Sequence, residues 1–171
     1  MPPPKIHFII TGGTIDSYYE GTLDTVKPHK KSVLPEFIES LKPYFKPKFT
    51  TVCMKDSREL TKKDLLKILK AIEKSPAKRI IITHGTYTMP DTARYLENNL
   101  KRKDQAIILT GSMIPLDGFN LNDAGFNLGY AIAKTSELKA GIYIAMNSKI
   151  FNSKESTKII QEGRFISLFS K

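Results

Sequence analysis

Short apolar runs alternate with amphipathic segments along the chain, and this alternation predicts strands and helices in turn. Buried strands are expected where apolar residues follow one another directly, at residues 5–10, 49–54, 79–84 and 105–110. Helices are expected where apolar residues recur every three or four positions, at residues 32–41, 61–75, 88–100 and 122–134. Two short final strands are expected at residues 141–147 and 149–152.

Local signals mark where the helices begin. Thr61, with Asp64 three positions later, has the pattern of a capping box. Thr88, with Asp91 three positions later, is expected to cap the third helix. Asp123 is expected to be an acid in the first turn of the fourth helix, stabilised by the helix dipole. These residues are explained as helix starts without any function.

The alternation of strands and helices predicts an α/β fold. We expect a three-layer, Rossmann-like arrangement, in which a largely parallel sheet carries helices on both faces. A length of 171 residues suits one domain, so a single domain is expected over residues 1–171. The segment from residue 15 to about residue 31 is polar and is expected to be a loop.

Composition is typical of a soluble globular protein, with 40% hydrophobic and 26% charged residues. There is no apolar run long enough to cross a bilayer and no signal-peptide pattern, so we expect no membrane association and a cytoplasmic location. Cys53 is the only cysteine, which excludes an internal disulfide and fits a reducing compartment. Its apolar context favours a core position over a nucleophile.

The net charge of +10 would suit an anionic ligand. However, the basic residues are scattered along the chain, and no nucleic-acid motif with interleaved aromatic residues is present. We therefore expect a solvated basic surface and no nucleic-acid partner. The three histidines lie far apart and lack metal-ligand spacing, so neither a metal nor a cofactor is expected.

Four loops rich in threonine, serine and glycine each follow a predicted strand, at residues 11–14, 54–59, 83–88 and 110–115. In a parallel sheet, ligands bind beyond the carboxyl ends of the strands, so these loops should converge on one small-molecule site. Their glycines allow close backbone approach, and their hydroxyls can act as nucleophiles. The standard phosphate-binding motifs are missing. For His84, a buried, hydrogen-bonded role is favoured over a general base.

Several segments match one family in order. They are TGGTI (11–15), DSRELT (56–61), HGTYTMPDTA (84–93), LTGSMIPLDGFNLNDAGFNL (109–128) and GIYIAMNSKIF (141–151). Together they resemble the N-terminal domain of bacterial-type L-asparaginases, with DSRELT closest to the cytoplasmic, type I-like branch. The resemblance covers nearly the whole chain.

This resemblance implies hydrolysis of a small amide by a threonine nucleophile, with release of ammonia. The attacking threonine would be Thr14. Thr86 would belong to a second catalytic group, which in the family includes a lysine and the next aspartate. Backbone N–H groups near Gly85 and Thr86 would hold anionic oxygen. The ligand would be a small amide or carboxylate, held by Gly13, Asp56, Ser57, Arg58, Gly85 and Tyr87.

The sequence departs from the family's pattern at three positions. Tyr87 replaces the aspartate that follows HGT, and Arg58 replaces the glutamine beside the substrate serine. The family's lysine is expected ahead of the strand at 105–110, where this chain has Gln105. Lys103, two residues earlier, is the alternative source of an amine.

Two further features separate the chain from the family's pattern. The mobile-loop tyrosine of the family has no match at its usual spacing, and Tyr18 and Tyr19 lie nearest to Thr14. The alternative interpretation is that both tyrosines only pack within the loop. The family's second domain, which supplies an acid to a neighbouring subunit's site, is absent from residues 1–171. Whether the chain forms a homo-oligomer stays open.

The departures fall around the place where the family binds the α-ammonium of its substrate. Each lost charge-assisted hydrogen bond weakens binding by about 1.5–3 kcal/mol. Recognition of free asparagine should therefore be poor. One hypothesis is a slow or retargeted amidohydrolase, whose ligand lacks a free α-amino group or carries an anion facing Arg58. The alternatives are a non-catalytic small-molecule sensor and an interaction protein with a vestigial pocket.

Overall fold

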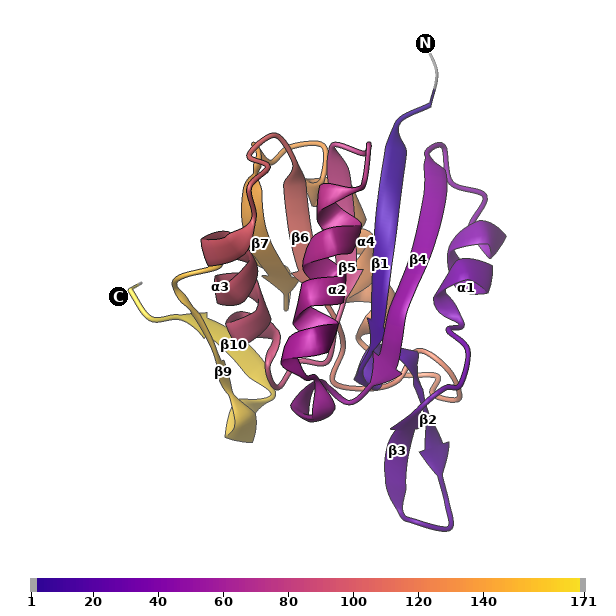
Figure 1. The fold of residues 1–171 in the computed structure, drawn as a ribbon. Coiled ribbons are helices and arrows are strands. Elements are labelled where there is room, and N and C mark those ends of the chain that lie inside the picture. The colour runs from indigo at the N-terminus through magenta and orange to yellow at the C-terminus, as the bar shows by residue number, and fades with distance from the viewer. Residues whose placement is uncertain (1–2, 170–171) are drawn as a thin grey trace.

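A six-stranded sheet forms the centre of the molecule (Figure 1). The structure is a computed structural model that describes residues 3–169. Neighbouring strands run parallel except the last pair, which is antiparallel, so the predicted largely parallel sheet is confirmed. In spatial order the strands are β4 (Lys46–Lys55), β1 (Lys5–Gly12), β5 (Arg79–Thr83), β6 (Ala106–Thr110), β7 (Gly141–Met146) and β8 (Lys149–Asn152).

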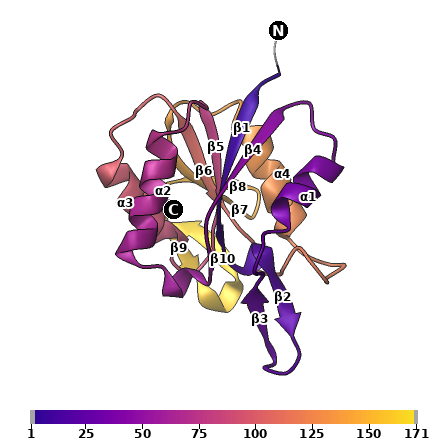
Figure 2. The same cartoon turned by 45° about the vertical axis from the view of Figure 1, so that its right-hand side comes forward.

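Helices cover both faces of this sheet (Figures 1 and 2). One face packs against α2 (Lys62–Glu73) and α3 (Met89–Asn99), and the other against α1 (Leu34–Ser40) and α4 (Ala124–Lys134). Successive side chains of a strand point to opposite faces, so each apolar run contributes to both cores. In β1, Ile9 belongs to the α2–α3 core, while Phe8 and Ile10 belong to the other. The predicted three-layer α/β fold is therefore confirmed.

The helix starts agree with the sequence only in part. Thr61 and Asp64 form the predicted capping box at the start of α2. Thr88 occupies the predicted N-cap position of α3, but its side chain makes no capping hydrogen bond there. Asp123 lies at the N-cap position of α4 and binds a neighbouring loop instead of acting as an acid in the first turn.

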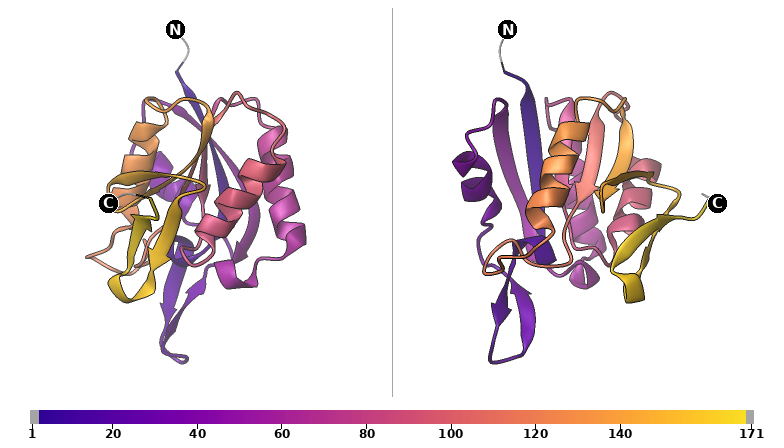
Figure 3. Two further views of the ribbon diagram at one scale, coloured as in Figure 1. Left: turned by 90° about the vertical axis from the view of Figure 1, so that its left-hand side faces the viewer. Right: turned by 180° about the vertical axis from the view of Figure 1, so that it is seen from behind.

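Two hairpins add to the core arrangement. The segment expected to be a loop contains an antiparallel pair, β2 (Ser17–Glu20) and β3 (Thr25–Pro28). A second pair, β9 (Ser156–Ile159) and β10 (Arg164–Ser167), follows the last sheet strand. Figure 3 shows β2 and β3 projecting beyond the end of the sheet, whereas β9 and β10 lie at the side of the molecule, next to α3. The pattern did not predict them because their strands are four residues long and largely polar.

Cys53 lies half-buried in β4, with its Sγ 3.5 Å from the carbonyl oxygen of Thr11. Burial raises the pKa of this thiol to about 11, so it is uncharged at neutral pH and suits a structural cysteine. None of the helices within residues 3–169 combines the length and apolar character that crossing a membrane would require.

His7 is a buried titratable group inside β1. It is 2% exposed, and its ring nitrogens lie 2.7 Å from Ser75 Oγ and 2.8 Å from Thr50 Oγ1. Burial, helped by the positive charge of Lys48, lowers the pKa of His7 to about 4. Between pH 6.5 and about 4, the unfolded chain therefore binds a proton that the folded chain does not. The contribution of His7 to stability is lost as pH falls through that window.

We expect His7→Gln to reduce the acid sensitivity of the fold, because glutamine can keep a polar contact without titrating. In wild type, His7 should lower the free energy of unfolding by at most about 1.4 kcal/mol per pH unit below pH 6.5. Urea denaturation of both proteins at several pH values between 4 and 7 measures the difference. Equal pH slopes for the two proteins would contradict the assignment.

Candidate active site

A cleft of about 180 Å³ opens at the carboxyl ends of β1 and β5. The parallel strands follow the order 2-1-3-4-5 in sequence terms, for which the crevice between the first and third strands is the expected ligand position. Every substrate-binding and catalytic residue that the resemblance implied lines this cleft, together with one lysine that it did not. The lining residues are Gly13, Thr14, Asp56, Ser57, Arg58, Gly85, Thr86, Tyr87 and Lys158.

Close backbone contact between three loops shapes the cleft. Gly13 has φ 80°, and a Cβ atom there would lie 2.3 Å from the backbone nitrogen of Gly85. A Cβ on Gly85 would lie 2.7 Å from both Cβ and Oγ of Ser57. Side chains at either glycine would therefore separate the loops that follow β1, β4 and β5.

Thr88 links two of these loops through its hydroxyl. This hydroxyl donates to the carbonyl oxygen of Ser57 at 2.9 Å, and the Thr88 N–H lies 3.4 Å from Ser57 Oγ. The side chain is thus used between loops, which is why it does not cap α3. As a result, Ser57 is held in place although it lies on a short 3₁₀ turn, Ser57–Glu59.

His84 supports the cleft from beneath and does not line it. It is fully buried, with Nδ1 2.7 Å from the carbonyl oxygen of Gly85 and Nε2 2.9 Å from Thr92 Oγ1. Burial lowers the pKa of His84 to about 4, so the ring is neutral at physiological pH. This arrangement confirms the expected buried, hydrogen-bonded histidine, whose ring carries no charge.

Lys158, on β9, supplies an amine to the cleft. Its Nζ donates to Thr86 Oγ1 at 2.7 Å. Burial lowers the pKa of Lys158, and the positive charge of Arg58 lowers it further, while Asp123 acts in the opposite direction. A lysine with a lowered pKa beside a buried threonine hydroxyl is a pairing suited to proton transfer. The sequence carries no local signal that would have identified this lysine, because its strand was not predicted.

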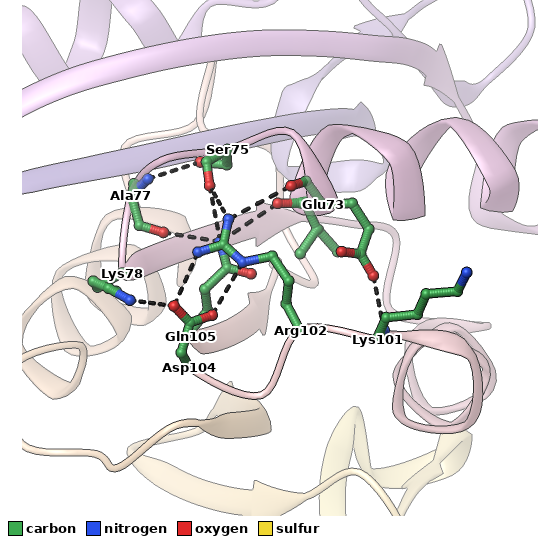
Figure 4. A network of polar contacts seen from close by, with 9 residues as sticks. Glu73, Ser75, Ala77, Lys78, Lys101, Arg102, Asp104 and Gln105 are labelled. Carbon is green, nitrogen blue, oxygen red and sulfur yellow. Dashed lines mark hydrogen bonds and ion pairs between the residues drawn. The ribbon is translucent and has the colours of Figure 1, made fainter.

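Gln105 and Lys103 lie elsewhere, so the predicted position of the amine was wrong. Both precede β6 and therefore lie at the amino ends of the parallel strands, opposite the cleft. Gln105 is buried, and its Nε2 lies 2.9 Å from the carbonyl oxygen of Ala77 and 3.2 Å from that of Ser75 (Figure 4). It joins α2 to the sheet, whereas Lys103 is exposed.

Arg58 and Tyr87 form the outer rim. The Arg58 guanidinium donates to Asp56 from Nη2 at 2.7 Å and from Nε at 3.0 Å, and it lies 5.5 Å from the centroid of the Tyr87 ring. Hydrogen bonds from Arg58 lower the pKa of Asp56. The two charges therefore compensate each other, and Asp56, the carboxylate among the lining residues, is not free to bind a cation.

The fourth predicted loop, residues 110–115, supports the cleft without lining it. A Cβ on Gly111 would lie 2.3 Å from the carbonyl oxygen of His84, and Met113 Sδ lies 3.7 Å from Thr86 Oγ1. The Met113 N–H donates to the Asp123 carboxylate at 2.9 Å. Asp123 thus orders a loop that packs against Thr86.

Tyr18 and Tyr19 lie on β2, outside the cleft. The Tyr18 ring is 5.1 Å from the His29 ring, and the Tyr19 hydroxyl donates to Asp24 at 2.6 Å. Packing within the hairpin accounts for both. Within residues 3–169, no group of three or more histidine, cysteine or acidic side chains is arranged to hold a metal ion.

Comparison with known proteins agrees with this geometry. The family model described as "Asparaginase, N-terminal" matches residues 5–165. The chain belongs to the asparaginase family. Among solved structures, this asparaginase domain is similar to the thermostable L-asparaginase from Thermococcus kodakarensis, with a TM-score of 0.79 and 26% identity over 95% of this chain and 51% of that one.

Two curated relatives show how far the likeness extends. A protein of Haemophilus influenzae named "Probable L-asparaginase periplasmic" is 28% identical over 91% of this chain and 46% of its own length. A glutaminase-asparaginase of Acinetobacter glutaminasificans is 35% identical over 60% of this chain and 32% of its own length. The asparaginase domain described here spans about half the length, or less, of these relatives.

Gln105→Leu should destabilise this asparaginase domain without changing its cleft. Leucine has a similar size but leaves buried carbonyl oxygens without their donor, which costs about 1–3 kcal/mol. Urea denaturation measures this loss of stability. The thermal shift caused by a ligand shows whether the cleft still binds it. If Gln105→Leu abolished the thermal shift while the fold stayed intact, the structural role given to Gln105 would be incorrect.

Proposed function

We propose that this protein hydrolyses a small linear amide and releases ammonia, using a threonine hydroxyl as the nucleophile. The observation that carries this proposal is the 2.7 Å contact between Lys158 Nζ and Thr86 Oγ1 inside a cleft that Thr14 also lines. Membership of the asparaginase family supports an amidohydrolase function at a coarse level. No metal or cofactor takes part in the proposed reaction.

In this proposal, Thr14 Oγ attacks the amide carbonyl carbon and forms a tetrahedral intermediate. The Lys158–Thr86 pair accepts the proton released by the nucleophile and passes it to the departing nitrogen. The C–N bond breaks, ammonia leaves and an ester to Thr14 remains. Water then attacks the ester, giving the carboxylic acid and restoring the hydroxyl. Lys158 suits the first step because burial favours its neutral form, which can accept a proton.

The charges around the cleft support a substrate other than free asparagine. Asp56 is the carboxylate among the lining residues, and Arg58 already binds it, while burial favours the neutral form of Lys158. An α-ammonium group would find no free counter-charge here, whereas a neutral nitrogen needs none. We therefore propose an amide ligand that lacks a free α-amino group. Its carboxylate would bind near Ser57, with Arg58 as a counter-charge.

Location in the cytoplasm remains a proposal, since one relative is named a periplasmic protein. We also propose that the protein binds no nucleic acid and assembles into a homo-oligomer.

Substitutions of Thr14 and Lys158 should distinguish the nucleophile from the proton-transfer group. Thr14→Ala should abolish both ammonia release and any acyl-enzyme, which mass spectrometry of the quenched protein detects. Lys158→Met should slow turnover at least 100-fold, because general acid–base catalysis contributes on that scale. This variant keeps the Thr14 hydroxyl. If the trapped acyl group were on Thr86, the assignment of the two threonines would be reversed.

The pH profile gives an independent test of Lys158. Only the neutral amine accepts a proton, so kcat/KM should rise with pH through the pKa of Lys158, which lies below 10.5. Lys158→Arg keeps the charge but should remove this limb. An unchanged profile in Lys158→Arg would contradict the role of this amine. Thermal shift on the inactive Thr14→Ala protein detects binding without turnover, which is the behaviour of the sensor alternative.

Restoring acidic and neutral groups at the rim should recover recognition of an ammonium. In the double variant Tyr87→Asp, Arg58→Gln, the affinity for free L-asparagine should increase by roughly tenfold or more, because Asp56 is released from Arg58 and a second carboxylate is gained. Isothermal titration calorimetry on a Thr14→Ala background measures this without hydrolysis. No gain in affinity would refute the proposed cause of retargeting.

A further inference from the structure

A second hollow of about 250 Å³ lies beside the cleft, and the two share Tyr87 and Lys158. Its remaining walls come from the start of α3 and from the segment that follows β8. The lining residues are Tyr87, Pro90, Asp91, Arg94, Thr157, Lys158 and Ile160. Because Tyr87 and Lys158 line both spaces, the second hollow adjoins the cleft.

The second hollow offers apolar surface and compensated charge. Tyr87 is 52% exposed and Ile160 is 57% exposed, so both present apolar surface to solvent. Arg94 is already paired, since its Nη2 lies 2.7 Å from Asp91 and its Nη1 lies 3.3 Å from the carbonyl oxygen of Ser156. A neutral group with some apolar surface therefore fits this hollow better than an ion does.

The charge of the cleft and the position of the hollow suggest the same ligand. The cleft offers an α-ammonium no free carboxylate, because Arg58 already binds Asp56, and acylation removes the ammonium charge. An acylated nitrogen also carries a chain that must leave the cleft. The adjoining hollow has a suitable polarity for such a chain, which would bury part of the exposed Ile160 side chain.

We propose that the second hollow binds the acyl part of an N-acylated substrate, so that the enzyme acts on the side-chain amide of a peptide-linked or otherwise acylated asparagine. This inference rests on the proposed function and extends it to a substrate class. Tyr87 is the wall between the two spaces, and Ile160 is the apolar contact of the acyl group. Arg94 and Asp91 neutralise each other and leave room for an uncharged chain.

Three compounds test the inference on the whole chain with Thr14→Ala, by isothermal titration calorimetry. They are L-asparagine, N-acetyl-L-asparagine and N-acetyl-L-leucyl-L-asparagine. The acetyl group removes the ammonium, and the leucyl residue then reaches the second hollow. Affinity should increase at both steps, by roughly tenfold at the second, as expected for burial of an apolar side chain.

Ile160→Ala should remove most of the second gain. The matched control is Leu168→Ala, because Leu168 has the same exposed fraction, 57%, and lies outside both spaces. The ratio of the affinities for the leucyl and acetyl compounds is the readout, since it cancels any general change in the protein. It should fall toward one in Ile160→Ala and stay at the wild-type value in Leu168→Ala.

The outcomes separate this inference from the proposed function. If the acetyl compound binds better than asparagine but the leucyl compound brings no further gain, the second hollow is not a subsite and the retargeting stands. If acetylation brings no gain, the account of the ammonium is wrong, and the leucyl step alone decides the subsite. If none of the three binds, the inference is overturned, and ammonia release from short aliphatic amides by the wild-type protein decides the proposed function separately.

Discussion

Contact between the backbones of three loops is the constraint on which the rest of the site depends. Gly13 lies against Gly85, and Gly85 lies against Ser57, with no space for a Cβ atom at either glycine. The strands β1, β4 and β5 bring these loops to one edge of the sheet, and the Thr88 hydroxyl holds two of them together. Thr14, Ser57 and Thr86 line one cleft because this contact exists, although they lie far apart in the sequence.

The sequence was informative where structure is local. Apolar periodicity predicted the sheet strands and the four helices, since one strand or helix carries its own pattern. It did not predict β2, β3, β9 and β10, whose strands are short and polar. The residues taken from family motifs all line the cleft, but Gln105 does not, because its position was inferred from spacing relative to a strand. Lys158 reaches Thr86 through tertiary packing, for which the sequence carries no local signal.

The charges around the cleft are linked to one another. A buried amine lies beside a hydroxyl, and the carboxylate among the lining residues is already bound by Arg58. The neutral His84 beneath the cleft adds no further charge. Arg58 also lowers the pKa of Lys158, so a substitution at Arg58 should change both the protonation of this amine and the charge at the rim.

The placement of Lys158 on β9 has a consequence for control of the protein. The hairpin of β9 and β10 pairs only with itself and is not hydrogen-bonded into the six-stranded sheet. Local opening of such a unit requires less free energy than global unfolding. Opening it would withdraw the amine from Thr86 and dismantle the wall near Ile160, and it would also remove Phe165 of β10 from the α2–α3 core. Cleavage or binding of a partner at this hairpin would therefore change the cleft, the adjoining hollow and the packing of one sheet face in one event.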